Sequence, residues 1–233
     1  MNIYLITKLI AFITMCIDHY GSIASIRIFR IIGRISFPLF CMLIGYGARN
    51  MKKPEKKIIK LFITAIVSIP ISMWFFEDKI INIIGGYFLF TLAIYVVKKL
   101  KLSTLSEVCI MILVASFMSV YNFDYAWLLV ALCYLFYKCT NKYLVSFLFI
   151  IIEGLYVLYK CMFNVSPVIG LHALLAVPFI LLFYFIIDHY KKNNIELKRH
   201  VYKNKFMNIL ASNIFYIMYP LHLIIIYYLY NYL

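Results

Sequence analysis

Lys8 and His19 are the residues near the start of the chain whose types and spacing suggest chemistry. An imidazole titrates near neutral pH, so His19 can act as a general base or as a nucleophile in group transfer. The two positions differ by eleven residues, or about three helical turns, which predicts one shared helix face and an axial separation of roughly 16 Å. Asp18 precedes His19 directly but points about 100° away on a helix, so the two are not automatically a dyad.

Further charged side chains and histidines lie inside or beside apolar segments. Such groups are costly in a membrane, so each needs a partner or a function. Arg30 and Arg34 are four residues apart and therefore share a helix face. Guanidinium groups suit phosphates and carboxylates alike, so this pair either binds an anion or forms structural ion pairs. The remaining candidates for a site are Asp124, Glu153, His172 and His222.

The composition places these residues in a membrane protein. Hydrophobic residues make up 65% of the 233 residues, whereas soluble domains have apolar fractions of roughly half. We therefore predict a polytopic, all-α membrane bundle that forms a single domain over residues 1–233. The net charge of +14 lies mainly in short loops without a basic helix or stacking motif, which indicates membrane topology rather than nucleic-acid binding.

Nine apolar segments can be counted, and most approach the roughly 20 residues that a spanning helix needs. Lysine and arginine gather in alternate connections, as in "ARNMKKPEKKIIK" and "KKLK". This pattern predicts nine spans with the N-terminus on the cytoplasmic side. The segments are 3–20, 28–46, 58–76, 80–97, 105–120, 125–137, 143–159, 165–187 and 209–229.

This orientation assigns a depth to each polar residue. A cluster of imidazoles, carboxylates and guanidinium groups at one depth predicts a polar cavity in the outer half of the membrane. Lys8 lies in the inner half, where it either borders that cavity or extends its ammonium group to the inner interface. Asp18 and His19 have an alternative interpretation as interfacial groups. The residues assigned to the outer half are His19, Arg30, Arg34, Asp124, Glu153, His172 and His222.

The six cysteines do not suggest a disulfide framework. Most lie inside apolar segments and none form a C-x-x-C pair. We interpret them as small buried hydrophobic side chains and expect no metal site.

Several stretches resemble the TraX family of membrane acetyltransferases, which is named for the conjugative pilin acetylase. They are "KLIAFITMCIDHYG", "IIGRISFPLFCMLIGYG", "GGYFLFTLAIYVV", "NFDYAWLLVALCYLFYK" and "NIFYIMYPLHLIIIYY", in family order over nearly the whole chain. The sequence departs from the family at Ala126, where glycine is usual after "DY". TraX proteins are similar to a wider group of membrane acyltransferases. In the sugar O-acetyltransferases of that group, a basic residue, ten intervening residues and a histidine mark the first helix, and Lys8 and His19 fit that spacing.

The resemblance implies an acetyltransferase that uses acetyl-CoA, with His19 as general base or acyl carrier. Asp18, or a carboxylate from another helix such as Asp124 or Glu153, would orient the imidazole. Lys8, Arg30 and Arg34 would bind the donor or an anionic acceptor. The acceptor site would comprise Asp124, Glu153, His172 and His222.

The implied acceptor is an amine or hydroxyl, either at the N-terminus of a pilin-like peptide or on a cell-envelope sugar. The expected location is the bacterial cytoplasmic membrane, and an apolar exterior in the lipid bilayer allows a homodimer. The competing interpretation is a small transporter or a non-enzymatic membrane partner protein, because intramembrane histidine and glutamate also build proton relays. No inverted repeat is visible in the sequence, which disfavours the common transporter folds.

Overall fold

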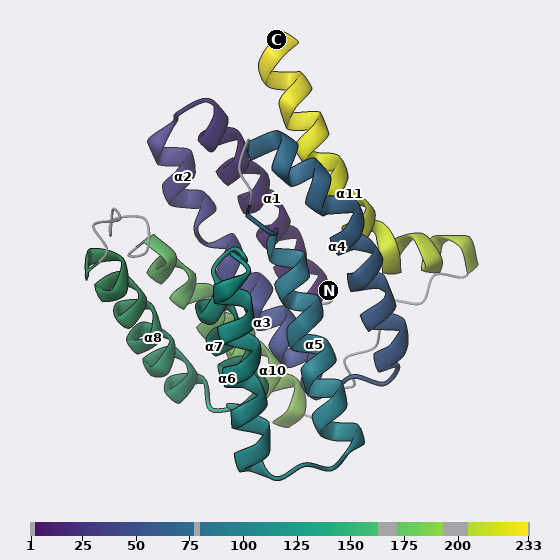
Figure 1. Cartoon of the computed structure of the whole chain (residues 1–233), viewed down its shortest axis with the longest axis vertical. Helices are drawn as coiled ribbons and strands as arrows, with labels where there is room; N and C mark the ends of the chain where they lie inside the picture. Colours follow the sequence, from purple (N-terminus) through teal and green to yellow (C-terminus); the bar gives the residue numbers. More distant parts are fainter. Residues whose placement is uncertain (1–2, 77–79, 163–171, 193–204, 233) are drawn as a thin grey trace.

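The computed structural model describes residues 3–76, 80–162, 172–192 and 205–232, and these residues form an almost entirely helical bundle (Figure 1). The predicted all-α class is confirmed, and each of the nine predicted apolar segments contains a helix. The first part of segment 165–187 lies outside the described residues. The elements are α1 (Ile3–Ile23), α2 (Arg27–Gly33), α3 (Ser36–Arg49), α4 (Pro54–Phe76), α5 (Ile83–Lys99), α6 (Thr104–Val120), α7 (Ala126–Lys138), α8 (Lys142–Met162), the 3-10 helix η1 (His172–Ala176), α10 (Val177–Lys192) and α11 (Lys205–Tyr232).

Six helical stretches among the described residues are long and apolar enough to cross a membrane. By contrast, α5 and α6 have 17 residues each and α7 has 13, or about 25 Å and 20 Å of helix against a hydrocarbon core of about 30 Å. The number of spans and the orientation of the N-terminus remain predictions. The six stretches are Ile3–Ile23, Arg27–Arg49, Pro54–Phe76, Lys142–Met162, His172–Tyr190 and Asn213–Tyr232.

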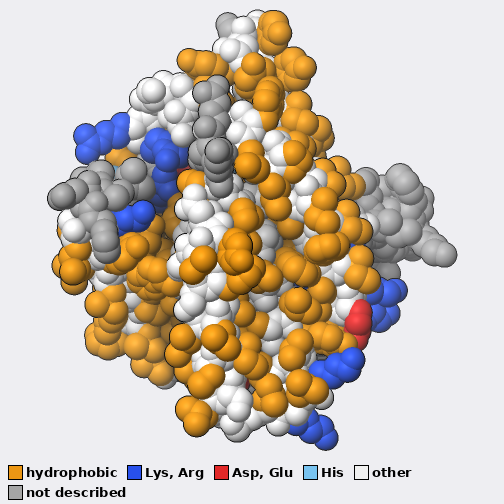
Figure 2. All heavy atoms as spheres, viewed as in Figure 1, with side chains coloured by type: hydrophobic (Ala, Val, Ile, Leu, Met, Phe, Trp, Pro, Cys, Tyr) orange, Lys and Arg blue, Asp and Glu red, His pale blue; other side chains and the backbone are white. Residues whose placement is uncertain are grey.

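The exterior is apolar, as a membrane protein requires. Hydrophobic side chains cover most of the face in Figure 2, and lysine and arginine side chains lie near its edges. Large apolar side chains are exposed along α4, α6 and α8, for example Ile66, Leu113 and Leu158. In water such a surface would be an aggregation hazard, so the fold supports the membrane class.

The second predicted segment is one span built from two helices. Helix α2 ends at Gly33 and α3 begins at Ser36, with Arg34 at the corner between them. Pro38 explains the break, because it has no N–H to donate to the carbonyl of Arg34 and is tolerated only within the first turn of a helix. The break directs Arg34 out of a continuous helix and toward α1.

Helices α1 and α2 form a tight hairpin that positions the residues around His19. Its connection turns at Ser25, which has a positive φ of 55°. A Cβ added to Gly21 would lie 2.6 Å from the Cβ of Phe29, and one added to Gly33 would lie 2.2 Å from the Cβ of Asp18. Neither position has room for a larger side chain, so the two glycines allow the helices to touch.

The turn before α7 is held against the start of α5. The backbone N–H of Asp124 donates to the carbonyl of Ile81 at 2.9 Å, and the N–H of Ile81 donates to the carbonyl of Asn122 at 3.1 Å. Asn82 caps α5 by accepting from the N–H of Ile84 at 3.1 Å, as N-cap side chains do. These hydrogen bonds therefore fix the position of Asp124 and Tyr125 beside α1 and α2.

Candidate active site

His19 of α1 and His222 of α11 form a direct pair. The Nδ1 atom of His19 lies 2.8 Å from Nε2 of His222, and their ring centroids are 5.0 Å apart at an interplanar angle of 20°. His222 is only 3% exposed, whereas His19 is half-buried. The partner of His19 thus comes from the last helix of the chain, as contact between α1 and α11 allows.

The hydrogen bonds around His222 determine which nitrogen atoms carry protons. Its Nδ1 lies 3.2 Å from the carbonyl oxygen of Met218 and also contacts the carbonyl of Tyr219. Carbonyl oxygens only accept, so Nδ1 carries the hydrogen and Nε2 of a neutral His222 is an acceptor. His19 then donates from Nδ1 to His222. In the neutral ring the lone pair of His19 is left on Nε2, which makes no hydrogen bond with the described residues.

Aromatic side chains surround the pair. Phe75 and Phe76, at the end of α4, lie with their ring centroids 6.2 Å and 5.2 Å from that of His19. Phe12 of α1 lies against His222 of α11, with their ring centroids 5.8 Å apart. Apolar walls of this kind lower the local dielectric constant and strengthen the hydrogen bond between the two imidazoles.

Asp18 faces two arginines rather than His19. Its Oδ2 accepts from Nη1 of Arg30 at 2.9 Å, and its Oδ1 lies 3.6 Å from Nε of Arg34. The second contact is an ion pair but not a hydrogen bond, and neither Oδ1 nor Nε has another hydrogen-bond partner within the described part of the chain. The α1–α2 hairpin is therefore closed by a charged contact one residue before His19.

Tyr125 extends this contact to the turn before α7. Arg34 donates from Nη1 to the Tyr125 hydroxyl, and the Tyr125 ring stacks on Phe37 with centroids 4.0 Å apart at 14°. Tyr125 and Ala126 have positive φ angles of 57° and 28°, which are strained for residues with a Cβ. Sequence reasoning missed Tyr125, Phe75 and Phe76. The alanine after "DY" was the one local signal that marked this turn.

A protein-family model matches the part of the chain that contains the candidate active site. A model of the TraX protein family matches residues 5–230. The chain belongs to the TraX family. The predicted family resemblance is therefore confirmed, and the match includes both histidines and the three residues of the Asp18–Arg30–Arg34 contact. No curated protein and no solved structure gives a significant match.

Lys8 of this TraX family protein lies on the same face of α1 as His19, as the spacing predicts. The ammonium group of Lys8 is 5.5 Å from the centroid of Phe215 on α11, and the ring of Phe12 is 6.2 Å from that of Phe215. The face of α1 that carries Lys8, Phe12 and His19 therefore packs along α11. Lys8 is exposed and lies toward the opposite end of this face from the histidine pair.

The other candidate residues of the TraX family protein lie outside α1 and α11. Asp124 is within electrostatic reach of Arg30 and Arg34. His172 begins η1, which contacts α2 and α3, and it is half-buried.

Glu153 of the TraX family protein is 1% exposed on α8, and its Oε1 has no hydrogen-bond partner in the described residues. Among those residues it makes no ion pair with Arg30 or Arg34. Within the same part of the chain, no group of three or more histidine, cysteine or acidic side chains is placed to hold a metal ion.

Proposed function

We propose that this TraX family protein is a membrane acyltransferase that moves an acetyl group from acetyl-CoA to an amine or hydroxyl acceptor. The observation that carries the proposal is the His19–His222 pair, which leaves the lone pair of His19 on Nε2. General-base catalysis needs a group that accepts a proton near neutral pH and is held in one orientation. His222 supplies the orientation, because its own ring is fixed by backbone carbonyls of α11.

In the general-base route, Nε2 of His19 takes the proton from the acceptor as the acceptor nitrogen or oxygen attacks the thioester carbon. The carbon–sulfur bond then breaks, the new amide or ester bond is complete, and the CoA thiolate takes the proton from His19. The charged intermediate form of His19 is stabilised by its hydrogen bond to His222. In the covalent route, Nε2 attacks the thioester carbon, the carbon–sulfur bond breaks and the CoA thiolate leaves, so that His19 carries the acetyl group. The acceptor then attacks this acetyl group, its bond to Nε2 breaks, and the acceptor proton passes to the thiolate.

The ion pairs of Asp18 support the proposed chemistry by holding the part of α1 that carries His19 in place. Asp18 balances one of the two arginine charges and fixes the end of α1 against α2. We assign Asp18 a positioning role, because its carboxylate faces the arginines. Arg30 is the more exposed of the two arginines and has the better access to an anionic group of an acceptor.

For the acceptor we favour the N-terminal amine of a pilin-like peptide, since the TraX family is associated with pilin acetylation. An envelope sugar is the second choice, and Asp124, Glu153, His172 and His222 are the residues proposed to border the acceptor. We place the protein in the bacterial cytoplasmic membrane with nine spans and a cytoplasmic N-terminus, which would let a cytosolic donor enter beside Lys8. A second copy of the chain is a further proposed partner.

The test uses purified protein in lipid nanodiscs, radiolabelled acetyl-CoA and a synthetic peptide with a free N-terminus. His19→Ala should abolish acetyl transfer while the variant inserts and unfolds like the wild type. His189→Ala is the matched control, because His189 is exposed at the end of α10 and should retain full activity. Full activity in His19→Ala would refute the assignment. Substrate-dependent proton flux without CoA would instead indicate a transporter.

Rapid-quench mass spectrometry separates the two routes. Mixing the wild type with acetyl-CoA in the absence of an acceptor should add one acetyl group to His19 in the covalent route. In the general-base route no acetylated His19 accumulates, although transfer proceeds once the acceptor is added.

A further inference from the structure

A small apolar cluster lies beside the histidine pair, and in the described part of the chain it is separate from the main core of the bundle. Its buried members are Phe75 of α4 and Leu223 and Ile226 of α11. Leu223 directly follows His222 in the chain, and the ring centroid of Phe75 is 6.2 Å from that of His19. An apolar surface next to a reacting group can bind the hydrocarbon part of a substrate.

Phe76 packs against this cluster and is the aromatic ring nearer to His19. The centroids of the Phe76 and His19 rings are 5.2 Å apart, and the rings meet edge to face at 77°. Phe75 supports Phe76 from the side, with centroids 4.7 Å apart at 80°. Phe75 is buried, whereas Phe76 and His19 are both half-buried. Phe76 therefore retains surface beside the imidazole that a bound molecule can touch.

The surroundings of His19 direct a hydrocarbon chain toward Phe76. His222 occupies the Nδ1 edge of the imidazole, so the reacting carbonyl carbon comes within about 3–3.5 Å of Nε2 or of the acceptor beside it. Asp18 and its two arginines are charged and lie on another side of α1, because adjacent residues point about 100° apart on a helix. An acyl chain is stabilised on the apolar side, where it meets the Phe76 ring as it lengthens.

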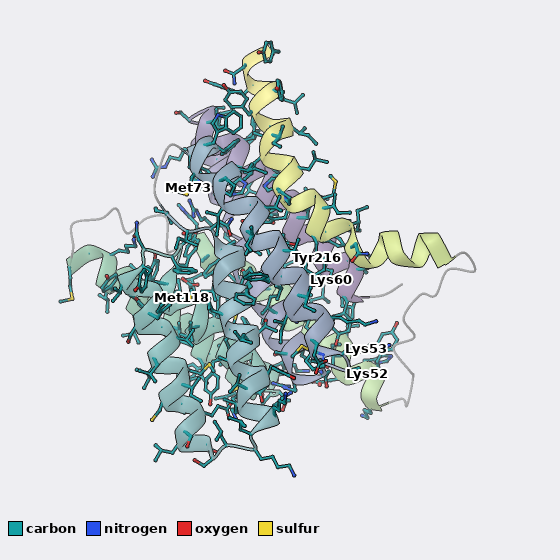
Figure 3. All side chains as sticks on the ribbon, turned by 45° about the vertical axis from the view of Figure 1, so that its right-hand side comes forward. Lys52, Lys53, Lys60, Met73, Met118 and Tyr216 are labelled. Atoms are coloured by element: carbon teal, nitrogen blue, oxygen red, sulfur yellow. The ribbon has the colours of Figure 1, made fainter. Side chains whose placement is uncertain are left out.

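Helix α4, which carries both phenylalanines, is packed along α11. Lys60 lies over the ring of Tyr216, with its ammonium group 5.7 Å from the centroid (Figure 3). Nearer the histidine pair, the Trp74 ring lies 4.3 Å from that of Tyr227 between centroids. The two helices therefore run side by side in the same direction, and the contact between them continues to the end of α4.

A hydrogen bond from α5 also holds the last turn of α4. Asn82, the N-cap residue of α5, donates from Nδ2 to the Ser72 hydroxyl at 3.4 Å, and both side chains are buried. Ser72 lies about one helical turn before Phe76. A ring fixed in this way can exclude a chain by its size, because close-packed side chains do not move aside without losing contacts.

We propose that Phe76, supported by Phe75, sets the length of the acyl chain that this TraX family protein transfers. This inference rests on the proposed acyltransferase function and names the substrate class of the same site, which is short-chain acyl thioesters. The methyl group of acetyl packs beside the phenyl ring, and a longer chain collides with it. Whichever acyl group is carried, the carbon–sulfur bond to CoA breaks and a bond to the acceptor forms, so only the fit of the chain differs.

The experiment compares acetyl-CoA, propionyl-CoA and butyryl-CoA as donors to the peptide acceptor, with the full-length protein in nanodiscs and mass spectrometry of the product. For the wild type, kcat/KM should fall with each added methylene group. Phe76→Ala should raise kcat/KM for butyryl transfer relative to acetyl transfer by about tenfold to a hundredfold, the range expected when a pocket gains room for a methylene group. Phe76→Trp should lower the ratio of propionyl to acetyl transfer.

Phe62→Ala is the matched control, because it removes the same side chain from an exposed position of the same helix. The Phe62 ring packs on Phe88, with centroids 5.2 Å apart, so this variant should keep the wild-type ratio. Partial unfolding lowers both rates and leaves their ratio unchanged. Phe76→Leu should give a ratio between those of the wild type and Phe76→Ala, which tests the role even if the alanine variant does not fold.

Two kinds of failure can be told apart. If the Phe76 variants keep the wild-type ratio, or if the wild type transfers butyryl as fast as acetyl, the role of Phe76 in chain length is wrong while the proposed function stands. If the wild type transfers no acyl group from any of the three donors, the proposed function is wrong and the inference is overturned with it.

Discussion

His19 and His222 are 203 positions apart in the chain, and Nδ1 of the first lies 2.8 Å from Nε2 of the second. The contact joins the first helix to the last, so the bundle must close before the pair exists. Because His222 is fixed by carbonyls of its own helix, the pair orients His19 without the help of a carboxylate. This arrangement differs from a triad in which an acidic residue orients the base.

Removing the second imidazole should impair catalysis without unfolding the protein. His222→Ala leaves Nδ1 of His19 without its acceptor, so the ring loses its fixed tautomer and kcat/KM for acetyl transfer should fall by about 10²-fold or more. His222→Gln offers an amide oxygen in a similar place and should recover part of the activity. Equal rates for His222→Ala and the wild type would contradict the role of the pair.

Enlarging Gly33 should disturb the site through Asp18. A Cβ at position 33 would lie 2.2 Å from the Cβ of Asp18, so Gly33→Ala must push α1 and α2 apart. Overpacking of this kind costs about 1–3 kcal/mol, and thermal unfolding in detergent should show a lower Tm together with reduced transfer.

Gly154→Ala is the control for this prediction. Nothing lies within 4 Å of a Cβ added to Gly154, and alanine favours a helix by up to about 1 kcal/mol over glycine. Its Tm should therefore equal or exceed that of the wild type. A Gly33→Ala variant as stable as Gly154→Ala would show that the hairpin can relax without cost.

Replacing Ala126 by glycine should stabilise the turn before α7. Ala126 has a φ of 28°, a strained value that glycine adopts freely. The relief should outweigh the added freedom of the unfolded chain and raise stability by about 1 kcal/mol, with Arg34 still bonded to Tyr125 and activity retained. Ala131→Gly in the middle of α7 should do the opposite and lower Tm. A drop in Tm for Ala126→Gly would disprove the strain.

Neutralising Asp18 should destabilise the hairpin. Asp18→Asn removes the carboxylate that contacts both Arg30 and Arg34, and the cost should be about 1–3 kcal/mol, below that of a fully buried pair because Arg30 is partly exposed. Glu55→Gln is the comparison, since Glu55 is exposed and bonds only to Tyr95 among the described residues. Its effect on Tm should be within error. Equal Tm values for the two variants would argue against a structural ion pair at Asp18.

The break between α2 and α3 was not predicted from the sequence, although a proline marks it. Segment 28–46 was predicted as one helix, because hydrophobicity measures whether a stretch can enter a membrane and not whether its hydrogen bonds continue. Pro38 marks the interruption. What the proline could not reveal is that the break would bring Arg34 to Asp18 and Tyr125.

The residues predicted to share one depth were grouped by topology alone, which says nothing about position around the bundle. Asp18, Arg30 and Arg34 meet because glycines let α1 and α2 touch. Glu153, assigned to the same depth, lies on α8 and makes no ion pair with these arginines within the described residues. The predicted depth in the membrane therefore selected candidate site residues. Only the packing of the helices against one another decided which of these residues meet.

The sequence by itself determined the class of the protein, the helices, the family and the common face of Lys8 and His19, because hydrophobicity and helical periodicity are local properties of the chain. Only the tertiary structure decided that His222 rather than Asp18 meets His19 and that Arg34 donates to Tyr125. Each of these pairs joins different helices, and their contact depends on how close the backbones come and in which direction the side chains leave them. Those quantities are set by packing among many residues at once, which no single segment encodes.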